Sequence, residues 1–175
     1  MPPPEPIPTP RLLLVPFTGE LAHLALHDRP RFARLLHAEV PDVWPNVEFA
    51  EVLGVLAPFH RKEPDRARWS RLIVWRSPRT LIGEVGAIDP PVNDGIVEIG
   101  YGVIPPWRGR GAATEAVAAF CTWIAAQPRI VEIRADTQVH NVASARVLVH
   151  AGFTTAGQRQ DATDGELLEW TRRVR

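Results

Sequence analysis

The chain has 175 residues, enough for one compact domain with a real apolar core, because domains of roughly 100 to 200 residues bury about 70% of their unfolded surface. Its 20 basic residues balance its 20 acidic residues, so there is no general attraction to nucleic acid or to an anionic membrane. The single cysteine, Cys121, excludes an internal disulfide framework and a cysteine-based metal cluster, which predicts a reducing compartment and therefore the cytoplasm.

The first ten residues are dense in proline, and we interpret them as an extended arm in front of a single domain at 11–175. This start has neither the basic nor the apolar region of a signal peptide. No apolar run approaches the roughly 18 residues of a spanning helix, so we expect no membrane segment. The six histidines lack metal-ligand spacing, so we expect no metal site.

The first half of the domain begins with a short apolar strand at 11–17 and continues with helical periodicity. Thr18 is a suitable cap for the first helix, and Pro30 suits the first turn of the second. The helical patterns cover residues 18–26, 30–38 and 46–56, and a polar stretch at 60–68 predicts a solvated loop.

From Leu72 the apolar period changes to that of strands, with strands expected at 72–75 and 81–88. Asn93-Asp94-Gly95 predicts a turn into a further strand. The remaining elements are expected as a strand at 96–104, a helix at 112–127, a strand at 130–136, a helix at 141–151 and a terminal hairpin from 153 to 172 around Asp164-Gly165. This order predicts an α/β domain with a mixed sheet.

The segment 105–116, PPWRGRGAATEA, joins the end of a strand to the start of a helix through a glycine-bearing turn. Gly109 and Gly111 permit positive φ, and the first turn of the helix offers unpaired N–H groups and a partial positive charge. Arg108 and Arg110 add cationic donors, and Thr114 adds a hydroxyl. The segment therefore predicts an anion site that suits a diphosphate.

Two other diphosphate motifs fit this segment less well. A P-loop requires Gly-Lys-Ser/Thr, and no lysine stands here. The dinucleotide fingerprint requires a third glycine, which Ala112-Ala-Thr lacks, although Asp136 at the end of the next strand leaves that interpretation open as a minor alternative.

The turn resembles the pyrophosphate motif of the GNAT superfamily of N-acetyltransferases, Gln/Arg-x-x-Gly-x-Gly/Ala, which reads here Arg108-Gly-Arg-Gly111-Ala-Ala113. The resemblance extends to Glu98-Ile-Gly-Tyr101, to Ala113-Thr-Glu-Ala116 and to the segment 141–153, with a spacing typical of Rim-type ribosomal-protein acetyltransferases. Together these segments cover roughly residues 80 to 172.

The resemblance implies a GNAT-like fold: a mixed, mostly antiparallel central sheet flanked by helices, with a splay between the strands that end near Ile104 and Asp136. Acetyl-CoA would lie with its pantetheine in the splay, hydrogen-bonded to the main chain of Val103 and Ile104. Asn141 would contact the cofactor near the thioester. The pyrophosphate would be bound by Arg108, Gly109, Arg110, Gly111, Ala112, Ala113 and Thr114.

The implied reaction is direct attack of a primary amine on the thioester, with the amine carried by a protein N-terminus or by a small molecule. Glu98 is the candidate base, and Ser144 resembles the family serine that protonates the leaving thiolate. Each has a plainer interpretation, because Glu98 can pair with an arginine of a neighbouring strand and Ser144 can make local bonds at a helix start. Trp44 and Trp69 are core residues or line an acceptor groove.

A non-catalytic acyl-CoA-binding module with the same fold is the alternative to an enzyme. Leu148 favours it, because many relatives carry a tyrosine near this place in the second helix. Cys121 is expected to be a small core residue rather than a nucleophile.

Overall fold

The computed structural model describes residues 4–89 and 94–174 in one mixed α/β domain. Its elements are β1 (Ile7–Pro8), β2 (Leu12–Pro16), α1 (Gly19–His27), α2 (Arg29–Leu36), α3 (Val47–Lys62), η1 (Pro64–Trp69), β3 (Ser70–Arg76), β4 (Arg79–Asp89), β5 (Ile96–Val103), η2 (Pro105–Trp107), α4 (Ala112–Ala125), β6 (Glu132–Gln138), α5 (Val142–His150), β7 (Thr154–Asp161) and β8 (Gly165–Arg173). Of the predicted turn at 93–95, Asn93 lies outside the described residues, and Gly95 has a φ of 72°.

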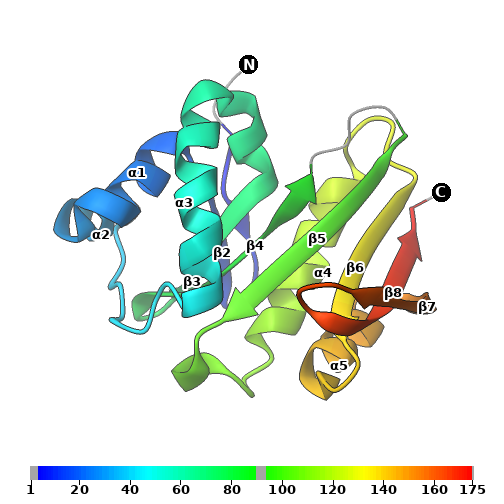
Figure 1. The fold of residues 1–175 in the computed structure, drawn as a ribbon. Coiled ribbons are helices and arrows are strands. Elements are labelled where there is room, and N and C mark those ends of the chain that lie inside the picture. Colours follow the sequence, from blue (N-terminus) through cyan, green and yellow to red (C-terminus); the bar gives the residue numbers. More distant parts are fainter. Residues whose placement is uncertain (1–3, 90–93, 175) are drawn as a thin grey trace.

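Eight strands form one sheet in the order β1-β2-β3-β4-β5-β6-β8-β7. Every neighbouring pair is antiparallel except β5 and β6, which are parallel. Helices α1 to α3 cover one face and α4 covers the other, as Figure 1 shows with α3 in front of the sheet and α4 behind it. This architecture confirms the predicted mixed, mostly antiparallel sheet with flanking helices.

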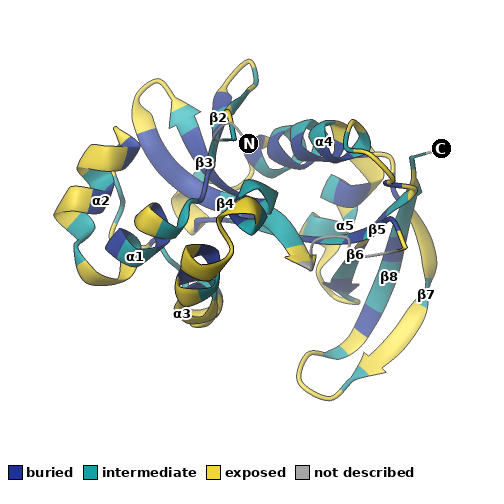
Figure 2. Ribbon diagram, turned by 90° about the horizontal axis from the view of Figure 1, so that it is seen from above, coloured by how far each residue is buried: buried dark blue, intermediate teal, exposed yellow. Residues whose placement is uncertain are grey.

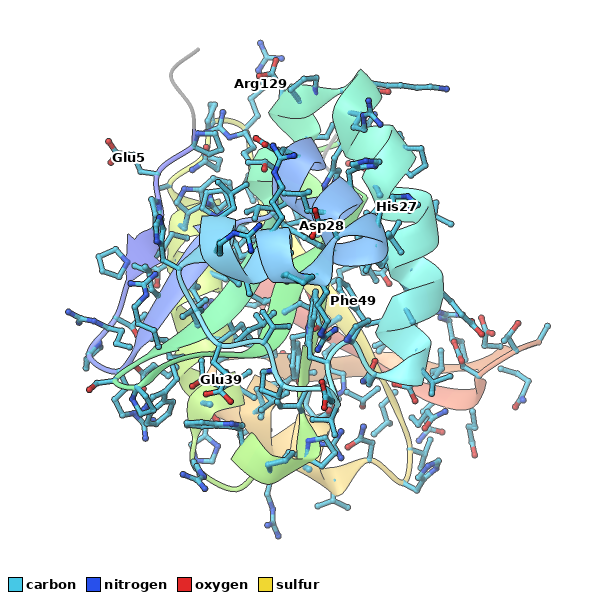
Figure 3. All side chains as sticks on the ribbon, turned by 90° about the vertical axis from the view of Figure 1, so that its left-hand side faces the viewer. Glu5, His27, Asp28, Glu39, Phe49 and Arg129 are labelled. Atoms are coloured by element: carbon cyan, nitrogen blue, oxygen red, sulfur yellow. The ribbon has the colours of Figure 1, made fainter. Side chains whose placement is uncertain are left out.

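Two apolar cores lie on the two faces of the sheet, because successive strand residues point to opposite sides. In β3, Ile73 packs with α4, whereas Leu72 and Val74 pack with α1 to α3. Figure 2 shows the buried central strands between exposed outer helix faces. Phe49 lies on the side of α3 that faces the sheet (Figure 3).

The predicted splay is present between β5 and β6. The two strands pair only over Ile96↔Glu132, Val97↔Ile133 and Glu98↔Arg134. Beyond these pairs β5 stays with β4, and β6 stays with β8, so the strands separate toward their carboxyl ends (Figure 1). The gap leaves one edge of β5 without a neighbouring strand beside the turn that leads to α4.

Helix α3 is longer than the sequence predicts, and the expected solvated loop at 60–68 is wrong. The helix continues past Pro58 to Lys62, and a 3-10 turn then occupies most of the remaining stretch. The extension is held by tertiary contacts, because His60 is buried and its Nδ1 lies 2.9 Å from the Phe17 carbonyl oxygen. Burial lowers the pKa of His60, in keeping with a neutral ring that belongs to the core.

The end of the N-terminal arm joins the sheet. Ile7 pairs with Leu14 of β2, and Thr9 donates a 2.6 Å hydrogen bond from its hydroxyl to Glu115 of α4. Within residues 4–89 and 94–174 no helix is long and apolar enough to cross a membrane, and no group of three or more His, Cys, Asp or Glu side chains is placed to hold a metal ion.

Candidate active site

A cavity of about 600 Å³ lies where the splay meets the start of α4 and the start of α5. Most of the predicted site residues line it: Val103, Arg108, Gly109, Gly111, Ala112, Ala113, Thr114, Asn141 and Ser144. Three predicted residues, Ile104, Arg110 and Glu98, are not among its lining residues. The structure thus brings the glycine turn and the second helix start together around one space, although they are about 30 residues apart in the chain.

The turn before α4 has the geometry of an anion site. Gly109 and Gly111 adopt φ values of 72° and 75°, in the left-handed region that favours glycine. Gly111 is the N-cap of α4 and supplies no side-chain acceptor, so the first N–H groups of the helix are directed at the cavity. A 14-residue helix adds a partial positive charge at this end.

The turn is braced by Arg11, a residue that sequence reasoning missed. Its Nη1 donates to the Arg110 carbonyl oxygen over 2.8 Å, and its Nε makes a 2.7 Å ion pair with Glu115. The Arg110 guanidinium lies over the ring of Trp107, 4.9 Å from its centroid. Arg11 is 99 positions from Arg110 in the sequence. Only the packing of β2 against α4 in the folded chain brings the two residues together.

The edge of β5 that faces the splay is formed by the main chain of Val103. The Ile104 N–H donates to the Ile82 carbonyl oxygen of β4 over 2.9 Å. The main-chain N–H and C=O groups of the preceding residue, Val103, therefore point to the other edge of β5, into the splay. Arg108 folds back and donates from Nε to the Val103 carbonyl oxygen over 2.8 Å. Main-chain groups of Val103 can therefore contact a ligand in the splay, as predicted. The Ile104 N–H cannot, because it already donates to Ile82 of β4.

Tyr101 connects the two sides of the splay. Its hydroxyl donates a 3.1 Å hydrogen bond to the carbonyl oxygen of Ser144, and burial raises the pKa of Tyr101 to about 12. Asn141 caps α5, and its Oδ1 accepts a 3.1 Å hydrogen bond from the Ser144 N–H. Leu148, at the position discussed for a tyrosine, is fully buried in the core. Tyr101 was within the recognised EIGY segment but was not predicted as a site residue.

A second cavity of about 550 Å³ lies between α3 and the sheet. It shares Asn46, Glu48, Tyr101 and Gly102 with the first cavity, so the two spaces meet beside the splay. The floor includes the glycines Gly86, Gly100 and Gly102, and the wall contributed by α3 is mostly apolar, with Phe49, Val52, Val55 and Leu56. The space therefore suits a molecule with an apolar body.

Glu84 is the half-buried carboxylate of the second cavity, and sequence reasoning missed it. Its Oε2 accepts a 2.9 Å hydrogen bond from Nε1 of Trp44, which is itself buried. Burial raises the pKa of Glu84 to about 7, an effect that the Trp44 hydrogen bond opposes and the nearby Glu48 reinforces. Trp69, by contrast, packs against Trp123 of α4 with ring centroids 5.1 Å apart.

Glu98 occupies the closed end of the splay. It is in register with Asp89 of β4 on one side and with Arg134 of β6 on the other. Gly102 is four positions further along the chain, which corresponds to about 13 Å along an extended strand. Glu98 lines neither of the two cavities, and its role as a base stays a prediction.

Residues 11–154 match the acetyltransferase (GNAT) domain family, so this chain belongs to that family. The uncharacterised N-acetyltransferase YjdG of Bacillus subtilis (strain 168) is 25% identical over 111 residues, which span 63% of this chain and 66% of that protein, just under two thirds of its length.

Solved structures share the fold over nearly the whole chain. An acetyltransferase of the GNAT family from Bacillus anthracis has a TM-score of 0.68 at 17% identity, with 97% of this chain and 98% of that chain covered. RimL, an alpha-N-protein acetyltransferase of ribosomal L7/L12 solved in complex with coenzyme A, has a TM-score of 0.68 at 18% identity, with the same coverage. At such identities the likeness concerns the fold.

Proposed function

We propose that this chain transfers an acetyl group from acetyl-CoA to a primary amine by direct attack on the thioester. The observation that carries the proposal is the meeting of two different spaces at Gly102. One space is lined by the start of α4, which suits an anion, and the other contains a half-buried carboxylate and apolar walls. A cofactor and an acceptor can thus approach one point from two sides.

The residues of the first cavity fit the cofactor. The N–H groups at the start of α4 and the guanidinium of Arg108 are donors for pyrophosphate oxygens, and the main chain of Val103 can pair with pantetheine amides. Asn141 lies at the α5 side of the same cavity, where its amide N–H₂ can donate to the cofactor arm while Oδ1 caps the helix. Bound acetyl-CoA would supply the activated acyl thioester.

Ser144 is proposed to protonate the leaving thiolate. It lines the first cavity at the start of α5, and its main chain is fixed on both sides, by Asn141 at the N–H and by Tyr101 at the carbonyl oxygen. These bonds hold the backbone and leave the hydroxyl for another partner. Leu148 cannot take this role, because it is an apolar side chain within the core.

The acceptor is a primary amine of a protein N-terminus or of a small molecule. The cytoplasmic address stays a prediction that rests on the single buried Cys121. The test is release of free thiol from acetyl-CoA in the presence of a panel of primary amines and N-terminal peptides. Turnover with at least one acceptor is expected, whereas binding of acetyl-CoA without thiol release for any of them would favour the non-catalytic acyl-CoA-binding module.

A further inference from the structure

The carboxylate of Glu84 lies directly against the strand that borders the splay. Glu84 of β4 is in register with Gly102 of β5, and a Cβ added to Gly102 would lie 2.6 Å from Glu84 Oε1. Gly102 lines both cavities. Because Gly102 has no side chain, the carboxylate can occupy the point at which the two spaces meet.

The two oxygens of this carboxylate have different surroundings. Trp44 Nε1 donates to Oε2, and the indole is held rigidly because it stacks on Phe32 with ring centroids 5.3 Å apart and an interplanar angle of 12°. This bond fixes the plane of the carboxylate and directs Oε1 toward Gly102. The arrangement presents one oxygen to a ligand and keeps the other tethered.

We propose that Glu84 is the catalytic base that takes a proton from the acceptor amine, and that Trp44 is the residue that positions it. The proposal rests on the proposed acetyl transfer and specifies the acid–base chemistry of the same site. An ammonium acceptor gives one proton to Glu84, and the freed nitrogen lone pair forms the C–N bond. The C–S bond then breaks, the Ser144 hydroxyl gives its proton to the thiolate and regains one from the second proton lost by nitrogen, and Glu84 releases its proton to solvent.

The surroundings of Glu84 suit a base that works near neutral pH. Strand β3 presents Leu72 in register with it, and β5 presents Gly102, so neither supplies a cation at these positions. Arg71 of β3 also lines the second cavity, but its guanidinium lies over the ring of Trp123 of α4 and donates to the Glu5 carbonyl oxygen. From α3 the charged group that faces it is Glu48, whose like charge raises the proton affinity further. With a pKa of about 7, Glu84 is half deprotonated at neutral pH and can exchange protons with an amine.

Glutamate-to-glutamine variants test the assignment. Glu84→Gln keeps the size of the side chain and an oxygen for Trp44, but it removes proton acceptance, so kcat/KM is expected to fall about 10² to 10⁴-fold. The rise of the acetyl-CoA-induced melting temperature should stay as in the unmodified chain, since the first cavity is intact. Glu51→Gln, on the exposed side of α3, is the matched control and should keep full activity.

A second variant leaves Glu84 in place and tests the base through its partner. Trp44→Phe keeps an aromatic ring but removes the N–H that favours the charged carboxylate, so the acidic limb of the kcat/KM profile should move upward by about 0.5 to 1 pH unit. Turnover should recover at high pH, which a merely structural loss would not produce. Near-normal turnover of Glu84→Gln, or an acidic limb that is unmoved in Trp44→Phe, overturns the assignment.

The predicted base Glu98 gives a direct comparison. The kcat/KM profile of Glu98→Gln is compared with that of Glu84→Gln. If the acidic limb is lost in Glu98→Gln and retained in Glu84→Gln, the base is Glu98 and the role of Glu84 is refuted. Absence of thiol release by the unmodified chain with every amine is a different result, because it contradicts the proposed acetyl transfer itself.

Discussion

Replacing Glu84 by glutamine should stabilise the protein at alkaline pH while it removes activity. In the unfolded chain this carboxyl has its ordinary pKa of 4.5, and burial raises the pKa to about 7 in the folded state. The folded state therefore binds the proton more tightly, and stability falls as the pH rises from about 4.5 to about 7. Each pKa unit corresponds to about 1.4 kcal/mol, so the ionised carboxylate costs the folded state on the order of 3 kcal/mol above pH 7.

The assay is urea unfolding of the unmodified chain and of Glu84→Gln at pH 4.5 and at pH 8.5. Other titrating groups are common to both proteins, so the quantity of interest is the difference in their unfolding free energies. That difference should shift in favour of Glu84→Gln by about 3 kcal/mol between the two pH values. Glu51→Gln should show no such change, because this side chain is exposed. A difference that is constant with pH would refute the desolvation argument.

Three other predictions concern the cofactor, the leaving group and the acceptor. The double variant Arg108→Ala with Gly111→Val should abolish most of the acetyl-CoA-induced rise in melting temperature, because it removes a cationic donor and puts a β-branched residue at a φ of 75°; an unchanged rise would place the pyrophosphate elsewhere. Ser144→Ala should lower kcat about tenfold with little change in acetyl-CoA affinity, and equal losses in binding and turnover would make Ser144 a positioning residue. Amines on an aryl or branched alkyl body should have lower KM values than polyamines, since α3 lines the second cavity with apolar side chains; the reverse order would contradict the groove as the acceptor site.

The fold and the glycine turn before α4 could be predicted because their signals are local. The segment 105–116 contains the end of a strand, two glycines with positive φ and a helix start within twelve residues, and the structure keeps them in that order. The cap residues Thr18 and Asn141 likewise act on N–H groups three residues ahead. Such features depend on the backbone within one or two turns, so the linear sequence contains nearly all of the information.

The second cavity and its carboxylate could not be predicted in the same way, because strand pairing decides which residues line that cavity. Glu84 and Glu98 look alike in the sequence, each an acid within an apolar strand. Which of them reaches a cavity depends on the β4–β5 register, on a bulge in that pair between Ala87 and Asp89, and on Trp44, which lies 40 residues from Glu84. These are long-range contacts, and no local pattern in the chain reports them.

In the proposed reaction, the two sides of β5 would let one short strand contact both substrates. The side chains of Tyr101 and Val103 belong to the α4 face, while the intervening Gly102 belongs to the α3 face, as the period of two in a strand requires. The main-chain edge beside Val103 is open because β6 has turned away, and the α3 face is open because glycine leaves it bare. A pantetheine arm along that edge and an amine over that face would therefore be separated only by the thickness of the strand, with Glu84 on the amine's side. The same absence of a side chain at Gly102 that admits the carboxylate also lets the two ligands approach each other.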